Sequence, residues 1–267
     1  MSTGVQCDIF VARPGGVADR CGERLRRTPP FVAALIVAAA GWVTLAALMI
    51  SAGVVLVGLV LPEGVGAWDD SVVRAFEDGR TGVLTDLSAV GSGLSDKVTV
   101  VVAGILLALV ASARRAWALF GLIVLSLVVE ITLYVAVTAV VHRRRPAVEP
   151  LELLRVDASF PSGHTAAAFA LYFSIAAVAA FYGARAFPRC IAWGAVVLIP
   201  LIVAVSRIYR GMHHPTDAIA GLAMGIGCVV VALLAVRTAQ VVARSRSCSS
   251  STQSTVKRRR GTPASTS

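Results

Sequence analysis

Long uncharged stretches alternate with short polar connections along most of this chain. Phe31–Leu61 carries no charge, and Ala116–Val141 carries only Glu130. A helix that crosses a bilayer needs about 20 apolar residues. Four further stretches fit shorter spans, and these are Val98–Ala113, Thr165–Tyr182, Ile191–Val205 and Ala218–Val236. The pattern predicts an all-α fold, a six-span transmembrane helix bundle.

The regions outside the spans differ from them in composition. Residues 1–30 form a Pro/Gly/Arg-rich arm, and residues 243–267 are rich in Ser, Thr and Arg, which predicts a disordered tail. The six-helix domain is expected over residues 31–242. Within the longest connection, 62–97, Trp68 and Phe76 belong to an apolar series at helical spacing. This series predicts a short helix that lies on the outer membrane interface.

Composition excludes an ordinary soluble domain, because 57% of the residues are hydrophobic and only 15% are charged. The net charge of +10 is concentrated on the side that holds both termini, if there are six spans. Basic segments stay in the cytoplasm, so both termini are predicted to be cytoplasmic in a multi-pass cell-membrane protein. The basic excess then reflects topology and contact with anionic lipid, not nucleic acid. Five cysteines without paired spacing support neither a disulfide framework nor a zinc site.

Three polar clusters interrupt the apolar pattern, and all fall on the predicted outer side. They are His142–Pro146, Ser159–His164 and Ser206–Asp217. Arginines gather in these clusters although the outer side is where the positive-inside bias removes them. An anionic ligand is the simplest explanation, and Arg145 and Arg207 supply planar donors suited to phosphate oxygens.

Two of the clusters coincide with predicted helix starts. Ser162 suits an N-cap, which places Gly163 and His164 in the first turn of the next helix. Unpaired backbone N–H groups and the helix dipole make such a turn an anion site, and glycine allows close approach. Pro215 fits the first position of the last helix, so Asp217 lies in its first turn.

This spacing also predicts a nucleophile. From the first turn, Asp217 is expected to reach back to His213 and fix its tautomer, which leaves the other ring nitrogen free to attack. His164 would stand beside the anion and exchange a proton near neutral pH.

At these residues the sequence resembles the type-2 phosphatidic acid phosphatase superfamily, which also includes vanadium haloperoxidases and bacterial acid phosphatases. The family pattern is K-x6-R-P, then P-S-G-H, then S-R-x5-H-x3-D. Pro161–His164 matches the second element, and Ser206–Asp217 contains the third at the right spacing. Arg145-Pro146 matches the end of the first element. The resemblance covers about residues 85–236.

The resemblance implies a role for each matching position. His213 would attack phosphorus, Asp217 would orient it, and His164 would protonate the leaving group. The phosphate would be bound by Arg145, Ser162, Gly163 and Arg207. No metal or other cofactor is implied, and the substrate would be a lipid phosphate held among membrane lipids.

Two positions in the third predicted span stand apart from the family pattern. Thr138 occupies the place of the family lysine, and Arg143 or Arg144 would partly replace that charge. Glu130 and Thr138 are expected on one helical face with Arg145, which would point Glu130 into the bundle. A structural hydrogen bond between helices and a functional part for Glu130 both remain open.

The sequence therefore predicts a membrane phosphatase that acts on a lipid phosphomonoester or pyrophosphate through a phosphohistidine, with a polyprenyl pyrophosphate preferred. Phosphatidic acid and phosphatidylglycerophosphate are the other candidate substrates. A phosphotransferase that passes the phosphoryl group to a lipid or sugar hydroxyl is one alternative. A non-catalytic lipid-phosphate binder is another, although a binder would need the arginines but not an ordered His–Asp pair.

Overall fold

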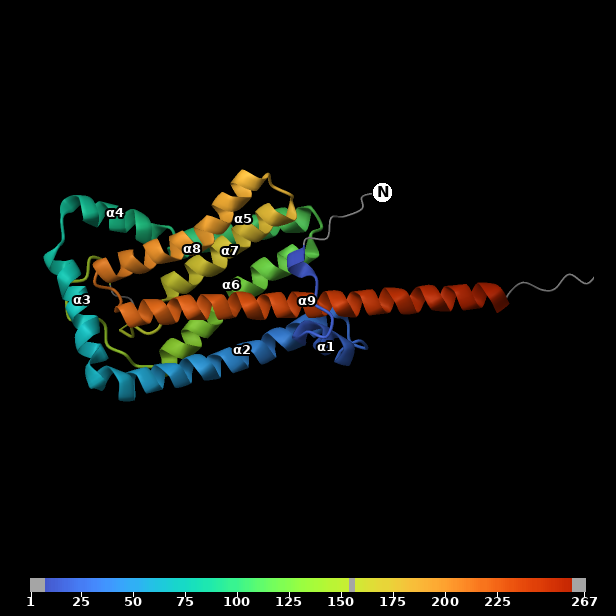
Figure 1. Cartoon of the computed structure of the whole chain (residues 1–267), viewed down its shortest axis with the longest axis horizontal. Helices are drawn as coiled ribbons and strands as arrows, with labels where there is room; N and C mark the ends of the chain where they lie inside the picture. Colours follow the sequence, from blue (N-terminus) through green and yellow to red (C-terminus); the bar gives the residue numbers. More distant parts are fainter. Residues whose placement is uncertain (1–7, 154–156, 261–267) are drawn as a thin grey trace, which may run out of the picture. The chain divides into compact units, whose positions relative to one another are not determined.

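The computed structural model describes residues 8–153 and 157–260, and most of these residues are helical (Figure 1). After a 3-10 turn at Asp8–Phe10 come α1 (Val17–Arg24), α2 (Pro30–Val55), a π-helical segment (Leu56–Val65), α3 (Gly66–Asp78), α4 (Gly82–Gly93), α5 (Lys97–Ala113), α6 (Trp117–Val140), α7 (Gly163–Phe181), α8 (Ala186–Tyr209) and α9 (Pro215–Arg260). Among the described residues, β-pairing is limited to one bridge between Arg144 and Ala158.

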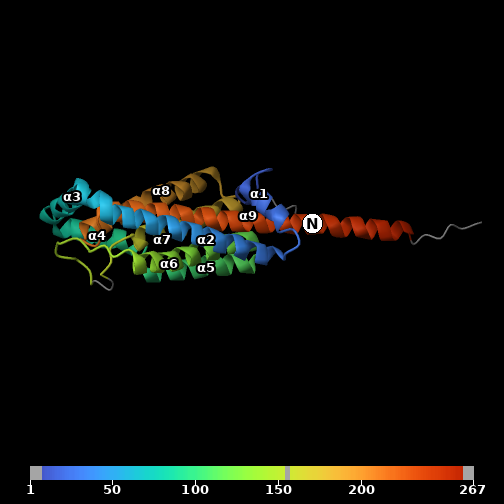
Figure 2. The same ribbon diagram turned by 90° about the horizontal axis from the view of Figure 1, so that it is seen from below.

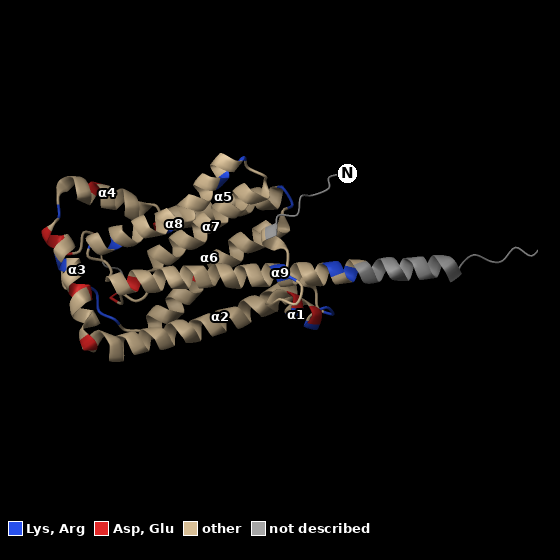
Figure 3. Ribbon diagram, in the orientation of Figure 1, with Lys and Arg blue, Asp and Glu red and all other residues tan. Residues whose placement is uncertain are grey.

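Within the described ranges, six helical segments are long and apolar enough to cross a membrane, which confirms the predicted all-α, six-span fold. These are Pro30–Asp78, Gly82–Ala113, Trp117–Val140, Gly163–Phe181, Ala186–Tyr209 and Pro215–Ser247. Charged residues gather at helix ends and in connections (Figure 3). The exposed side chains between them include Val102, Ile105 and Leu109 of α5. An apolar outer surface on helices of this length is typical of contact with lipid.

The first predicted span differs from the structure at its C-terminal end. After α2 the chain continues through the π-helical segment, which contains Pro62 and breaks at Gly64, where φ is +103°. The predicted short helix follows as α3, with Val73 buried and Trp68 half exposed. A left-handed φ is accessible to glycine at little cost, so Gly64 turns the chain from α2 into α3. The location of α3 on a membrane interface stays a prediction.

Residues 40–232 form one compact unit that contains all the predicted site residues. Helices α5 and α6 lie side by side in it, and α7 packs between α6 and α8 (Figures 1 and 2). Its core includes Met49, Leu133, Phe160, Met224 and Cys228.

Close contact between α7 and α9 positions the start of each helix. A Cβ atom on Gly221 would collide with the backbone carbonyl of Ser162, and one on Gly225 would lie 2.7 Å from the carbonyl oxygen of Ala166. Only glycine allows this approach. The Gly221–Gly225 motif therefore packs inside the bundle.

The second unit comprises residues 1–39 and 233–267. Helix α1 packs on α9 in it, where Gly22 faces Val241 and Arg237 Nε donates to the carbonyl of Ile9 at 2.8 Å. Helix α9 runs to Arg260, into the segment for which the sequence predicts disorder, because extending an existing helix costs far less than starting one. Residues 261–267 of that tail lie outside the described residues.

Candidate active site

Backbone hydrogen bonds join the three polar clusters at one end of α7 and α9. The N–H of Ser162 donates to the carbonyl of Asp217 at 3.0 Å, and the N–H of Ser159 donates to the carbonyl of Arg143 at 2.8 Å. Arg145 Nη1 donates to the carbonyl of Met212 at 2.5 Å. The clusters, far apart in sequence, thus form one site.

His213 is held in one orientation by the connection between α6 and α7. Its Nδ1 lies 2.7 Å from the carbonyl oxygen of Ser159, and its side chain is 3% exposed. A carbonyl only accepts, so Nδ1 carries the proton and Nε2 keeps its lone pair. Burial lowers the pKa of His213 well below its ordinary value; Asp217 acts in the opposite direction, and Arg207, Arg145 and His164 lower it further. His213 is therefore a neutral imidazole with a free Nε2.

Asp217 does not make the predicted hydrogen bond to His213. The two side chains are 3.9 Å apart at their closest N and O atoms, which is too long for one. One carboxylate oxygen instead accepts from the backbone N–H of His214 at 2.9 Å and faces its Nδ1 at 3.2 Å, and the other accepts from Arg143 at 2.5 Å. A carboxylate in the first turn meets the unpaired N–H groups there before it can reach further back.

The sequence did not predict the ion pairs that Arg143 makes. Besides Asp217, it donates to Asp69 of α3 at 2.6 Å and to the hydroxyl of Thr216 at 2.6 Å. Asp69 also accepts from the N–H of Thr216 at 3.1 Å. Arg143 is thus paired with two buried carboxylates and Arg144 is exposed, and their partial replacement of the family lysine stays a prediction.

The start of α7 matches the predicted arrangement. Ser162 is the N-cap residue, and Gly163 and His164 lie in the first turn. The hydroxyl of Ser162 accepts from Thr165 Oγ1 at 3.0 Å instead of capping the backbone. A Cβ atom on Gly163 would lie 3.0 Å from the ring of Tyr134, so glycine leaves room for this ring beside the helix start. The first-turn N–H groups have no partners within the helix.

The proposed phosphate-binding arginine Arg207 is held by a glutamate. Arg207 Nη1 donates to Glu152 at 2.5 Å and to Ser92 Oγ at 2.9 Å, and Arg210 Nε donates to the other oxygen of Glu152 at 2.6 Å. Burial alone would raise the pKa of Glu152, but Arg207 and Arg210 outweigh it and lower the pKa to about 2. No sequence pattern marked Glu152 or Arg210 as site residues.

Two residues of α6 lie below the site. Glu130 and Thr138 are both buried, which agrees with the expectation that Glu130 points into the bundle. Thr138 Oγ1 has no hydrogen-bond partner among the described residues. Helix α6 ends at Val140, so Arg145 lies beyond the helix and the predicted shared face with Arg145 is wrong.

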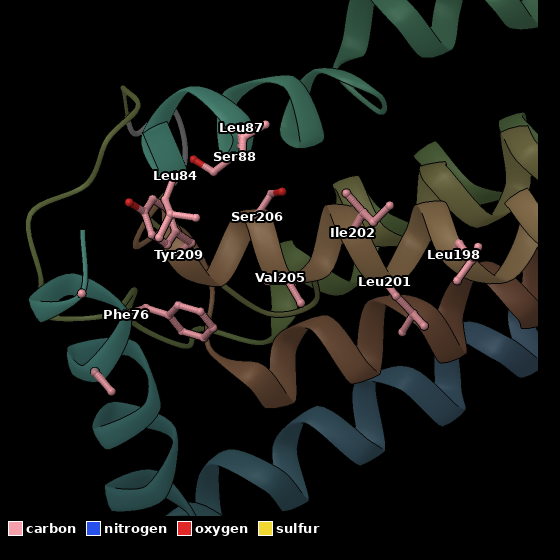
Figure 4. A pocket seen from close by; sticks show the side chains of 12 residues that line it. Phe76, Leu84, Leu87, Ser88, Leu198, Leu201, Ile202, Val205, Ser206 and Tyr209 are labelled. Atoms are coloured by element: carbon pink, nitrogen blue, oxygen red, sulfur yellow. The ribbon is translucent and has the colours of Figure 1, made fainter. Parts of the chain in front are cut away.

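An apolar pocket of about 480 Å³ lies between α3, α4 and α8 (Figure 4). Its α8 residues recur three and four positions apart, from Leu198 to Tyr209, whereas Arg207 is rotated by about 100° from Ser206. Gly91 packs against Ser206 and closes the gap between α4 and α8. Arg207 therefore does not line the pocket, which meets the arginine cluster at Ser88, the acceptor of a 3.1 Å hydrogen bond from Arg210.

The bundle and its site are those of a helical membrane protein in which a buried histidine lies beside a cluster of arginines at the helix ends. Residues 115–240 match the PAP2 superfamily, which confirms the resemblance. This range contains Arg145, Ser162, Gly163, His164, Arg207, His213 and Asp217.

Two solved structures are similar to this chain, and the first of them has a similar fold. The first transmembrane PAP2 type phosphatidylglycerolphosphate phosphatase from Bacillus subtilis is 21% identical with a TM-score of 0.59, and the alignment covers 72% of this chain and 93% of that chain. Aquifex aeolicus LpxE is 23% identical with a TM-score of 0.49, over 61% of this chain and 93% of its own. None of the curated proteins matches this chain.

Proposed function

We propose that this chain is an integral membrane phosphatase that removes the phosphate from a lipid, with His213 as the nucleophile. The observation that carries the proposal is the 2.7 Å bond from His213 Nδ1 to the carbonyl of Ser159, because it leaves Nε2 unprotonated in a buried, arginine-lined site. The match to the PAP2 superfamily supports a phosphatase. The fold of the Bacillus subtilis phosphatase supports a membrane location.

The reaction proceeds in two displacements. Nε2 of His213 attacks phosphorus while the bond to the leaving oxygen breaks, and His164 gives a proton to that oxygen. Arg145 and Arg207, with Ser162 and the first-turn N–H of Gly163, hold the phosphate oxygens. Water then attacks the phosphohistidine, His164 accepts its proton, and His213 is released with inorganic phosphate.

Asp217 acts on His213 through its charge. The imidazole becomes positively charged when Nε2 bonds to phosphorus, and a carboxylate oxygen 3.9 Å from Nδ1 stabilises that charge without a hydrogen bond. The carbonyl of Ser159, not Asp217, fixes the tautomer in this scheme.

The proposal also covers the orientation of the chain in the membrane, the need for a metal and the identity of the substrate. The active site is extracytoplasmic and both termini are cytoplasmic, since the basic tails are retained inside. The reaction needs no metal, because a histidine nucleophile and arginine donors supply the chemistry. The substrate is a lipid phosphate, and the family resemblance favours a polyprenyl pyrophosphate over phosphatidic acid or phosphatidylglycerophosphate.

The test is phosphate release from a polyprenyl pyrophosphate and from phosphatidic acid, in detergent with EDTA. Wild type is compared with His213→Ala, and His142→Ala is the matched control because His142 is exposed. Release that persists in EDTA, disappears in His213→Ala and survives in His142→Ala is expected. Release that survives in His213→Ala would overturn the nucleophile assignment. Transfer of phosphate to an added lipid or sugar alcohol would instead identify a phosphotransferase, and binding without turnover would identify a binder.

A further inference from the structure

Glu152 places a negative charge inside the arginine cluster of the site. Its two carboxylate oxygens bridge Arg207 and Arg210, and Ser92 Oγ donates to one of them at 3.1 Å. The low pKa of Glu152, about 2, keeps it ionised at any pH at which the protein would be assayed. Glu152 therefore cancels part of the positive charge that a phosphate would meet.

Four of the five N–H donors of Arg210 are engaged by the protein. Besides Glu152, its Nη1 donates to the carbonyl of Thr85 at 3.3 Å and to Ser88 Oγ at 3.1 Å, and its Nη2 donates to the carbonyl of Leu151 at 3.0 Å. Arg207 differs, because its buried Nε has no hydrogen-bond partner among the described residues. Arg207 thus keeps an unused donor, whereas most donors of Arg210 are taken by the protein.

The carboxylates around the arginines also favour a substrate with a single phosphate. Each arginine of the site has a carboxylate near it. Arg143 pairs with Asp69 and Asp217, Arg207 and Arg210 share Glu152, and Asp157 acts on Arg145. A phosphomonoester carries about 1.5 to 2 negative charges at pH 7, and a diphosphate carries more. Arginines whose charge is partly compensated in this way are matched better to the smaller anion.

Glu152 also acts electrostatically on the residue proposed to protonate the leaving group. Glu152 and Arg207 both act electrostatically on His164, the proposed proton donor to the leaving group. The leaving group of a phosphomonoester is an uncharged alcohol once protonated, but that of a diphosphate is itself a phosphate. A second phosphate beside His164 would meet the negative charge of Glu152. The cations that act there are Arg207, which is already paired with Glu152, and Lys97, and Thr138 adds none.

We infer that this site selects a lipid phosphomonoester over the corresponding lipid diphosphate, and that Glu152 is the residue that sets this preference. The inference rests on the proposed lipid phosphatase function. It changes the expected substrate of that function, because the family resemblance favours a lipid pyrophosphate. Glu152 is a positioning residue in this scheme, because it touches the phosphate-binding arginine and not the reacting atoms.

The test uses two substrates with one hydrocarbon tail, farnesyl monophosphate and farnesyl diphosphate, and the full chain in detergent. The kcat/KM for phosphate release is measured for wild type, Glu152→Gln and Thr138→Lys. Glu149→Gln is the matched control, because Glu149 is an exposed acid of the same connection. Wild type is expected to favour the monophosphate, and Glu152→Gln is expected to shift the ratio of kcat/KM values toward the diphosphate by about tenfold.

Thr138→Lys is expected to shift the ratio in the same direction, which keeps the test decisive if Glu152→Gln does not fold. Glu149→Gln is expected to leave the ratio unchanged. A wild type that prefers the diphosphate would overturn the inference, as would an unchanged ratio in a folded Glu152→Gln. Wild type inactive on both lipids would overturn the proposed function itself, so the two failures are distinguishable.

Discussion

Arg143 donates to Asp217 at 2.5 Å, and both side chains are nearly inaccessible to solvent, with exposures of 5% and 0%. This pair, rather than a contact between Asp217 and His213, holds Asp217 at the start of α9. Arg143 joins Asp217 to Asp69 on α3, so a residue of the connection before α4 takes part in positioning the start of α9. The site depends on an ion-pair network that extends beyond the family motif.

The first prediction concerns this network. Arg143→Gln leaves Asp69 and Asp217 as adjacent buried carboxylates, and the loss of one partner of a buried ion pair costs about 3–5 kcal/mol. The free energy of unfolding and kcat are both expected to fall, which thermal melting and phosphate release in detergent will measure. Arg144→Gln is the control, since Arg144 is exposed.

A double variant separates the network from a general defect. Adding Asp69→Asn to Arg143→Gln removes one of the two unpaired charges, so the double variant is expected to lose less stability than the sum of the two single losses. Additive losses would show that Arg143 and Asp69 are not coupled.

The second prediction concerns pH. The folded protein holds His213 neutral because burial lowers its pKa well below 6.5, whereas an unfolded chain takes up this proton near 6.5. As pH falls below 6.5 the unfolded state binds more protons, so the free energy of unfolding decreases by up to about 1.4 kcal/mol per pH unit for one group. The contribution is fully present above pH 6.5 and is lost on acidification.

Melting temperatures at pH 7.5 and pH 5.5 check this prediction, with wild type compared with His213→Gln. Wild type is expected to lose more stability on acidification, because the glutamine does not titrate. Equal losses in the two proteins would contradict a neutral, buried His213.

The sequence predicted the features that follow from local patterns. Uncharged stretches located the six spans because every span must present apolar side chains to lipid. Ser162 and Pro215 located the starts of α7 and α9 because helix ends impose local requirements on the backbone.

Side-chain partners between distant segments were not predictable in the same way. Asp69 lies in a segment whose only visible signal was the spacing of its apolar residues, so nothing in the sequence linked it to Arg143. Asp217 bonds to Arg143 and to the backbone of His214 instead of to His213, because the fold brings these competing donors within its reach. Glu152 lies in an irregular connection, where no periodicity indicates which way a side chain points.

The third prediction tests the contact that brings the two helix starts together. Gly221→Ala directs a methyl group at the backbone of Ser162, which cannot move without disturbing its bond to Asp217. Overpacking of this kind costs about 1–3 kcal/mol, so both the melting temperature and kcat are expected to fall. Gly194→Ala is the matched control, because that α8 position has open space and alanine favours helix by up to about 1 kcal/mol. If Gly221→Ala melts and turns over like Gly194→Ala, α7 and α9 do not approach as closely as described.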